Sequence, residues 1–250
     1  STEVGKILLA QCATTVKKVC MELGGHAPFI VFDDADIDEA VIGAMTTKFR
    51  NTGQTCICAN RIYVHEKVYD EFLEKFGNAV SKIKVGDGFE EGVISGPLID
   101  EFSLNKVKEQ VTDAVNTGAK VAVGGDVHSL GGNFFQPTVI SNVTSKAKIT
   151  YEETFGPVAP LYKFSNDEEV IKMANDTPYG LASYFYSRDI GRVWRVAEAL
   201  EYGIVAVNNG APTKAEIPFG GIKESGSGRE GSKYGIDDFL EIKYISMAGI

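Results

Sequence analysis

Two side chains of this sequence have the types needed to attack a carbonyl carbon and then hydrolyse the product of that attack. Cys56 lies in the segment GQTCICAN (residues 53–60), just after a glycine turn, and Glu22 lies in the segment MELGG (residues 21–25). A thiolate is a strong nucleophile towards a carbonyl, and a nearby carboxylate can activate water by taking its proton. The pair therefore indicates acyl chemistry through a thioester, provided that folding brings the two segments together.

Each of these residues also has a purely structural interpretation. A cysteine is most often a small buried side chain, and a glutamate at a strand end is most often solvated. The polar, turn-forming residues 51–55 instead favour an exposed loop, where backbone amides can stabilise a Cys56 thiolate. Glu22 lies between the apolar Met21 and Leu23. Partial burial is therefore expected to raise its pKa and suit it to acid–base work.

Two further residues near Cys56 have types that suit a site. Arg50, six residues earlier, is able to pair with the far carboxylate of a short aldehyde acid; the alternative is a surface cation on the last turn of a helix. Cys58 forms a Cys-x-Cys pair with Cys56. That pair either closes to a disulfide that silences the nucleophile, or Cys58 is a packing thiol that never reacts. The sequence leaves both pairs of alternatives open.

The segments that must position these residues alternate between strand-like and helix-like patterns. Short apolar runs are followed by segments with apolar residues at helical spacing and with cap residues before them. Strands are expected at residues 28–32, 61–65, 120–123, 181–187 and 204–208, and helices at 37–45, 66–83, 100–117, 166–175 and 190–200. Such alternation implies crossover connections, so the predicted fold class is α/β with a largely parallel sheet flanked by helices.

The two ends of the chain carry their own expectations. The first residues read as the start of a helix with no strand before it, so the chain is expected to be cut at its amino end. Residues 239–247 (FLEIKYISM) are β-rich and terminal. A terminal strand must pair with something, so this segment is predicted to be an association site.

Composition excludes several classes of function. The 250 residues are 44% hydrophobic and 24% charged, which is ordinary for a globular protein, and no apolar run approaches the roughly 20 residues of a membrane span. A net charge of −9 argues against a nucleic-acid or anionic-membrane partner. All four cysteines lie in the first quarter of the chain, which favours a reducing compartment inside the cell. The three histidines share no metal-ligand spacing, so no metal site is predicted.

Five ordered blocks of the sequence resemble signatures of the aldehyde dehydrogenase superfamily, and they cover essentially the whole chain. The blocks are ELGG (22–25), GQTC (53–56), ETFGP (153–157), PFGG (218–221) and SGSGRE (225–230). Within the superfamily, residues 49–60, 86–92 and 228–236 are similar to the succinate-semialdehyde dehydrogenases. The resemblance implies NAD or NADP as the cofactor, a small aldehyde as the substrate, a homodimer or homotetramer, and a place in the cytoplasm or the mitochondrial matrix.

The resemblance also implies a role for individual residues. Cys56 would form a thiohemiacetal and, after hydride transfer, a thioacyl-enzyme, with its backbone amide holding the oxyanion. Glu22 would activate the water that hydrolyses the thioester. Glu153 would bind the nicotinamide ribose, Phe155 would shape that pocket, and Arg50 would bind the substrate carboxylate.

The amino end and one loop carry further implied roles. Residues 1–5 look like the end of the family's pyrophosphate turn, so Ser1 and Gly5 are cofactor-binding candidates. Where the succinate-semialdehyde enzymes commonly place a serine near the carboxylate, this chain has Thr213 and Lys214. Lys214 would substitute as a cationic partner or point away. Cys58 is a redox-switch candidate on the same resemblance.

The resemblance thus divides the chain into three parts and implies one reaction. Residues 1–24 would end a Rossmann-type dinucleotide-binding domain, 25–224 would form the catalytic domain, and 225–250 would return and end in an oligomerisation strand. The reaction would be oxidation of succinic semialdehyde to succinate with NAD(P). The alternatives are an aldehyde dehydrogenase for another short aldehyde and a non-catalytic structural relative. The chain would be the carboxy-terminal portion of such an enzyme, nearly inactive alone.

Overall fold

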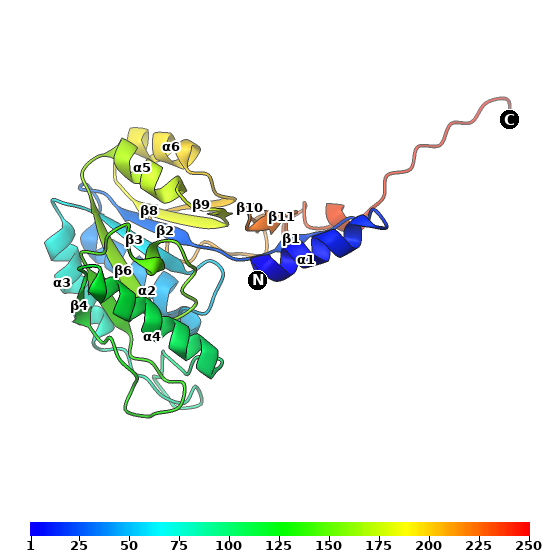
Figure 1. The fold of residues 1–250 in the computed structure, drawn as a ribbon. Coiled ribbons are helices and arrows are strands. Elements are labelled where there is room, and N and C mark those ends of the chain that lie inside the picture. The colour runs from blue at the N-terminus through cyan, green and yellow to red at the C-terminus, as the bar shows by residue number, and fades with distance from the viewer.

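Seven strands form one sheet in the order β4-β5-β6-β3-β2-β8-β9 (Figure 1). The computed structural model describes residues 1–250. The strands are β2 (Ala27–Val31), β3 (Ala59–His65), β4 (Lys120–Val123), β5 (Thr138–Ser141), β6 (Val158–Phe164), β8 (Ala182–Tyr186) and β9 (Ile204–Val207). Every neighbouring pair is parallel except β4 and β5. The predicted α/β class with a largely parallel sheet is confirmed.

Helices cover both faces of this sheet. The helices are α2 (Ile37–Phe49), α3 (Tyr69–Val80), α4 (Glu101–Asn116), α5 (Asp167–Asn175) and α6 (Ile190–Ala199). Successive side chains of a strand point to opposite faces. Phe29 and Val31 therefore pack with α2 and α3, whereas Ile30 and Phe32 pack with α4, α5 and α6. Burial on both faces explains why this strand is a continuous apolar run in the sequence.

Side-chain caps fix where most of these helices begin. Asp36 accepts a hydrogen bond from the Glu39 amide at the start of α2, and Asp100 accepts one from the Ser103 amide at the start of α4. Such caps satisfy backbone donors that have no partner within the helix. All five predicted helices are present, although α3 begins at Tyr69 rather than at residue 66.

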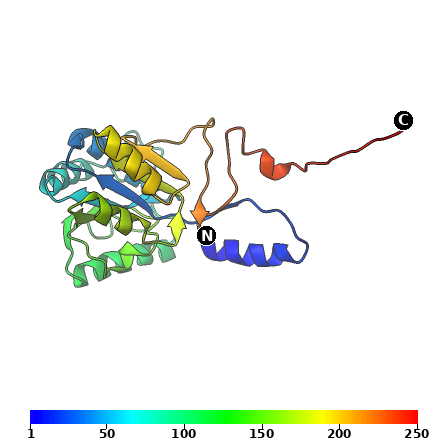
Figure 2. The same cartoon turned by 90° about the horizontal axis from the view of Figure 1, so that it is seen from above.

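A thin extension leaves the edge of this body (Figure 2). It contains α1 (Thr2–Ala13), and a two-stranded ribbon joins β1 (Met21–Glu22) to β11 (Gly226–Ser227). A second ribbon pairs β7 (Tyr179–Gly180) with β10 (Ile222–Lys223). Two 3₁₀ turns lie at Lys148–Thr150 and Asp237–Phe239. Residues Arg50–Gly53 form a further turn, in which Asn51 and Thr52 have non-helical backbone angles. No helix combines the length and the apolar character that crossing a membrane requires.

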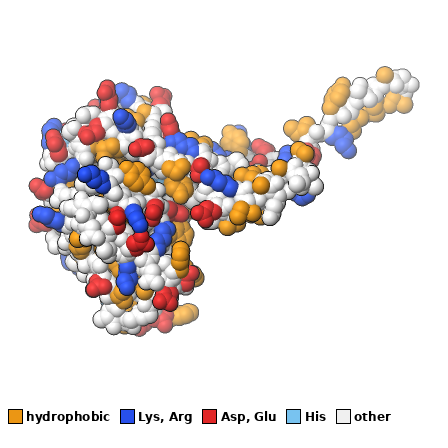
Figure 3. All heavy atoms as spheres, in the orientation of Figure 1, with side chains coloured by type: hydrophobic (Ala, Val, Ile, Leu, Met, Phe, Trp, Pro, Cys, Tyr) orange, Lys and Arg blue, Asp and Glu red, His pale blue; other side chains and the backbone are white.

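The predicted terminal strand is not formed in this chain. Residues 240–250 have no helix or strand and run away from the body as an extended tail (Figures 1 and 2). Apolar side chains are spread along this tail in Figure 3, and Ile242 is fully exposed. A strand exists only where its backbone pairs with a neighbour, and here there is none. The association role of residues 239–247 stays a prediction.

Candidate active site

The segments of Glu22 and Cys56 meet because each leads into one of two neighbouring parallel strands. Residues 22–25 precede β2 and the Cys56 turn precedes β3, and these strands pair in parallel with Ala27 opposite Ala59. The starts of parallel neighbours lie at the same edge of a sheet. Segments that are distant in sequence are therefore placed side by side.

Two glycines allow the Cys56 turn to pack closely against neighbouring backbone segments. A Cβ atom on Gly25 would lie 2.0 Å from the backbone oxygen of Cys56, so no side chain fits there. A Cβ atom on Gly53 would lie 2.3 Å from the backbone oxygen of Gly156, and Gly53 has a φ of +72°. Backbone contacts this close need glycine. They tie the cysteine block to both the ELGG and the ETFGP blocks.

The turn before Cys56 has an unusual backbone. Asn51 and Thr52 have φ angles of 51° and 61°, so with Gly53 three successive residues are left-handed. This conformation is rare for a β-branched residue such as Thr52, and such outliers concentrate at active sites. The Thr52 hydroxyl accepts a hydrogen bond from the Gly96 amide at 2.9 Å, which helps to hold the turn. The segment that contains Gly96 thus supports the turn.

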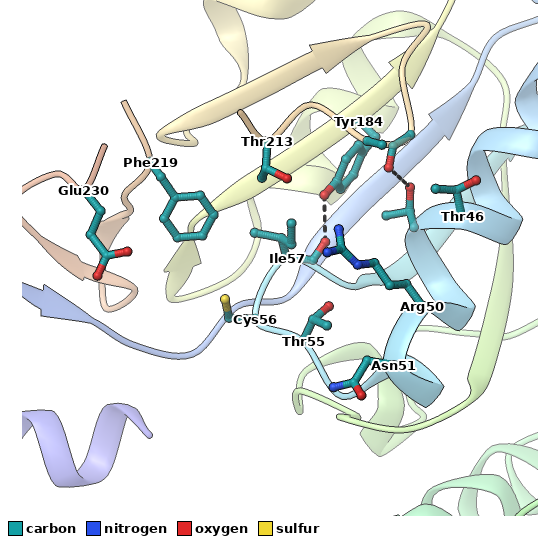
Figure 4. Close-up of a pocket in the computed structure, with 13 residues that line it drawn as sticks. Thr46, Arg50, Asn51, Thr55, Cys56, Ile57, Tyr184, Thr213, Phe219 and Glu230 are labelled. Carbon is teal, nitrogen blue, oxygen red and sulfur yellow. Dashed lines mark hydrogen bonds between the residues drawn. The ribbon is translucent and has the colours of Figure 1, made fainter. Parts of the chain in front are cut away.

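Cys56 is the one residue that lines both of two adjacent cavities. The first cavity has a volume of about 480 Å³ and lies between α2, the Cys56 turn and residues 210–219 (Figure 4). The second has a volume of about 360 Å³ and is lined by Glu22, Glu153 and Phe155 among others. Cys56 therefore borders both cavities, and a small molecule in either one would lie next to it.

The surroundings of the Cys56 thiol act on its pKa in both directions. Burial raises the pKa, and the carboxylates of Glu22 and Glu153 raise it further. The nearby backbone amides of Cys56 and Ile57 lower the pKa in part. The net effect is a raised pKa, so this environment favours the thiol form of Cys56 over the thiolate.

Glu22 has the environment of a general base. Both of its carboxylate oxygens are buried without a hydrogen-bond partner. Burial, and to a smaller extent the negative charge of Glu230, raise the pKa of Glu22 to about 7, against the opposing effect of Arg229. The pKa increase predicted from its apolar neighbours is confirmed. A carboxyl group that titrates near neutrality is suited to proton transfer in either direction.

The second cavity has features that fit a nicotinamide nucleotide. Glu153 accepts a hydrogen bond from the Gly25 amide at 2.9 Å through Oε1, which leaves Oε2 able to accept from a sugar hydroxyl. Phe155 presents an aromatic ring that is 39% exposed, on a backbone with a φ of 52°. Ser1 also lines this cavity. An aromatic wall beside a free carboxylate oxygen suits a ring joined to a ribose.

Gly5 has a different position from the one expected. It is buried in the contact between α1 and Leu23, where an added Cβ would lie 2.5 Å from a Leu23 methyl carbon. It does not line the second cavity. The reason for glycine here is close packing of a helix. Ser1 is the N-cap of α1, as its position in the sequence predicts.

The first cavity contains Arg50 but not Lys214. Arg50 follows the last turn of α2 and lines the cavity together with Thr213. Lys214 is exposed and is not among the lining residues. Successive residues of an extended loop point in different directions, so only one member of the Thr213–Lys214 pair faces inwards. The hydroxyl of Thr213, not the ammonium of Lys214, is the polar group that this loop supplies.

Cys58 is fully buried, with no exposed surface. The Lys48 ammonium donates to its sulfur at 3.3 Å and to Asn60 Oδ1 at 3.0 Å. Burial raises the pKa of the Cys58 thiol more than the nearby Lys48 charge lowers it. A buried protonated thiol reacts slowly with oxidants, which favours the packing role in this conformation. The redox switch stays a prediction that requires the turn to open.

Several residues of the site carry no clear signal in the sequence. Glu230 and Phe219 line the first cavity because residues 219 and 230 pair across the returning segment. Tyr184, in the middle of β8, donates to the Ile57 backbone oxygen at 2.8 Å, as one dashed line in Figure 4 shows. The positions of these three side chains depend on contacts between distant segments. Glu230 does belong to the SGSGRE block (225–230), but that block does not by itself place Glu230 at this cavity.

The electrostatic coupling between Glu22 and Cys56 predicts a result for thiol labelling. Iodoacetamide should alkylate Cys56 slowly near neutral pH and faster as the pH rises, because the thiolate is the reactive form. Glu22→Gln removes a charge that raises the pKa of Cys56, so the labelling rate at about pH 8 should increase severalfold. Peptide mapping by mass spectrometry measures the rate. Cys58 serves as the internal control and should stay unlabelled; an unchanged or slower Cys56 rate would contradict the coupling.

Comparison with known proteins gives a consistent result along the chain. A family model described as the aldehyde dehydrogenase family matches residues 1–245. The chain is 60% identical to the 3-sulfolactaldehyde dehydrogenase of Pseudomonas putida over 250 residues, which are 100% of this chain and 51% of that protein. It is 60% identical to the NADP-dependent succinate-semialdehyde dehydrogenase of Escherichia coli over 245 residues, covering 98% of this chain and 51% of that protein.

A solved structure agrees with these sequence matches. The crystal structure of succinate-semialdehyde dehydrogenase from Burkholderia pseudomallei superposes with a TM-score of 0.97 at 58% identity. The superposition covers 98% of this chain and 51% of that one. The chain therefore spans about half the length of the proteins that it matches.

Proposed function

Because this chain belongs to the aldehyde dehydrogenase family, we propose that the protein carrying it oxidises a short aldehyde acid to the diacid with NAD or NADP. The observation that carries the proposal is the position of Cys56 between two cavities, one containing Arg50 and the other Glu22 and Glu153. A nucleophile reached from two sides is able to meet a substrate and a hydride acceptor together.

The first half of the proposed reaction forms a bond to sulfur. The Cys56 thiol gives its proton to solvent water, and the thiolate attacks the aldehyde carbon. A C–S bond forms, and the π electron pair of the carbonyl moves to its oxygen, which becomes an oxyanion. The backbone amide of Cys56 would hold that oxyanion, as the family resemblance implies. A nicotinamide held in the second cavity by Glu153 and Phe155 would supply the hydride acceptor for the same carbon. A thioester on Cys56 remains.

The second half of the proposed reaction breaks that bond. The carboxylate of Glu22, with a pKa of about 7, takes a proton from a water molecule, and the hydroxide attacks the thioester carbon. The C–S bond breaks with its electron pair on sulfur, and the acid leaves. The proton held by Glu22 then returns the sulfur to its starting state as a thiol. Glu153 would hold the cofactor through the oxygen that the Gly25 amide leaves free.

We propose succinic semialdehyde as the substrate, bound with its carboxylate at Arg50 and the Thr213 hydroxyl. A guanidinium binds a carboxylate through two parallel hydrogen bonds, and the same geometry suits a sulfonate. A short aldehyde with another anionic end group is therefore the second candidate, and the match to a 3-sulfolactaldehyde dehydrogenase supports it. The two cavities, together with the Cys56 and Glu22 side chains beside them, argue against a non-catalytic structural relative.

We also propose the larger organisation that the resemblance implies. Residues 1–24 would belong to a cofactor-binding domain, residues 25–224 to the catalytic domain, and residues 225–250 to a segment that pairs between subunits. The whole protein would form a homodimer or a homotetramer, and it would be located in the cytoplasm or the mitochondrial matrix. The exposed apolar tail is consistent with a segment covered in an assembly.

Arg50→Ala tests the proposed substrate. The KM for succinic semialdehyde should rise by about 10- to 100-fold with little change in kcat, because a charge-assisted contact made equally in the ground and transition states is lost. Butanal, which has no charged end, should be affected by less than about twofold. Steady-state kinetics with both aldehydes measure this.

The matched control for that experiment is Arg188→Ala, which removes an exposed arginine paired with Asp36 on the surface. It should leave both KM values unchanged. Equal losses for the two aldehydes in Arg50→Ala would mean that Arg50 supports the turn rather than the substrate.

A further inference from the structure

We propose that Thr47 is a positioning residue that sets the separation between Arg50 and Thr213, and with it the length of the acid that the first cavity accepts. The inference rests on the proposed function. Two parts of the chain that are distant in sequence meet at the first cavity: the end of α2 and the loop that follows β9. We call this contact, between residues 43–47 and Gly210, the seam.

The Thr47 hydroxyl lies at the centre of this seam. It is 2.8 Å from the Gly43 backbone oxygen, within its own helix, and 2.8 Å from the Gly210 backbone oxygen in the loop. The side chain is only 6% exposed. A hydroxyl has one proton to donate, so the helix and the loop share it.

The backbones on either side of the hydroxyl touch directly. An added Cβ on Gly210 would lie 2.6 Å from the Gly43 oxygen. The loop therefore rests on the helix without an intervening side chain at this point. Two facing carbonyl oxygens would repel each other, and the shared proton of Thr47 offsets that repulsion. Without it, the loop is expected to move away from α2.

The two parts of the seam carry the two groups proposed to hold the acid. Arg50 lies three residues after Thr47 at the end of the same helix, and Thr213 lies three residues after Gly210 in the same loop. Thr47 lines the first cavity with both of them. A displacement of the loop from the helix changes the distance between Arg50 and Thr213 directly. Because Cys56 is fixed on the neighbouring turn, that distance governs which chain length places the aldehyde at the sulfur.

The alternative role for Thr47 is a hydrogen bond within its own helix only. Threonines in helices often bond the carbonyl one turn earlier, as Thr112 does with Lys108 on the surface of α4. If Thr47 did only this, loss of its hydroxyl would lower stability a little and leave selectivity unchanged. The two interpretations therefore predict different kinetic results.

The test compares Thr47→Val, which keeps the shape and loses the hydroxyl, with Thr47→Ser, which keeps the hydroxyl. The kcat and KM are measured for succinic semialdehyde, for glutaric semialdehyde, which is one methylene longer, and for butanal. In Thr47→Val the KM for succinic semialdehyde should rise about three- to tenfold, and its preference over the longer acid should fall by a similar factor. Turnover of butanal should change by less than about twofold, and Thr47→Ser should match the wild type.

Two further variants keep the test decisive. Thr112→Val, which removes a helical hydroxyl far from the cavity, should leave the length preference unchanged. If Thr47→Val does not fold, Gly210→Ala forces the same seam apart from the loop side and should change the length preference in its place.

The outcomes separate the inference from the proposed function. A wild-type enzyme that does not prefer succinic semialdehyde to butanal would overturn the proposed function. A wild-type enzyme that has this preference, with Thr47→Val and Gly210→Ala retaining the wild-type ratio between the two acids, would overturn the inference alone.

Discussion

Replacing Cys56 by Ala is expected to abolish aldehyde oxidation, with kcat falling by at least about 10⁴-fold in the protein that carries this chain. Without the sulfur no covalent intermediate forms, and neither cavity offers another nucleophile at their junction. The effect should appear in single-turnover experiments as well as at steady state, because the first bond-forming step is lost. Absorbance of the reduced nicotinamide measures both rates.

The matched control is Cys58→Ala, two residues further along. That thiol is buried against Lys48 and lines neither cavity, so its loss should leave kcat within about threefold of the wild type. Thermal unfolding of both variants checks that they fold. Substantial activity in Cys56→Ala, or equal losses in the two variants, would remove the basis for a thioester at Cys56.

Glu22→Gln is expected to separate the two halves of the reaction. The amide cannot take a proton from water, so steady-state turnover should fall by about 10²- to 10⁴-fold. Formation of the thioester does not need that base, so one equivalent of reduced cofactor per site should still form rapidly. Hydroxylamine, which cleaves thioesters without a base, should restore turnover in part. Loss of the rapid first turnover would show that Glu22 is needed before hydrolysis.

The pKa of Glu22 gives the sign of the pH effect. Water activation requires the carboxylate, whose fraction rises as the pH passes the raised value of about 7. Where hydrolysis limits the rate, kcat of the wild type should therefore fall below about pH 7 and level off above it. Glu22→Gln should lose this dependence. Glu3→Gln, at an exposed position on α1, should retain it.

Much of the fold is encoded locally and was predictable. Asp36, Asp100 and Asn166 cap α2, α4 and α5 at the positions that their types indicate. Both faces of β2 are buried, so its continuous apolar run gives the correct strand. The meeting of Glu22 and Cys56 follows once β2 and β3 are recognised as parallel neighbours.

Other features depend on contacts that a single segment does not reveal. β5 has only four residues, and β6 contains Pro160, a residue that argues against a strand within a sheet. For these reasons the sequence pattern does not predict β5 or β6. The charge of Lys214 suggests a carboxylate partner in the sequence, whereas the fold places Thr213 at the cavity. Thr47 gave no signal at all, because its importance arises only where the loop of Gly210 meets α2.

Passage of the acyl group through the Cys56 sulfur can be measured directly. The Glu22→Gln protein is mixed with succinic semialdehyde and NAD or NADP, quenched in acid after the rapid first turnover, and digested for peptide mapping by mass spectrometry. A single succinyl group, sensitive to hydroxylamine, is expected on the peptide that contains Cys56. Reduced cofactor produced without any acyl group on that peptide, or with the group on another residue, would contradict it.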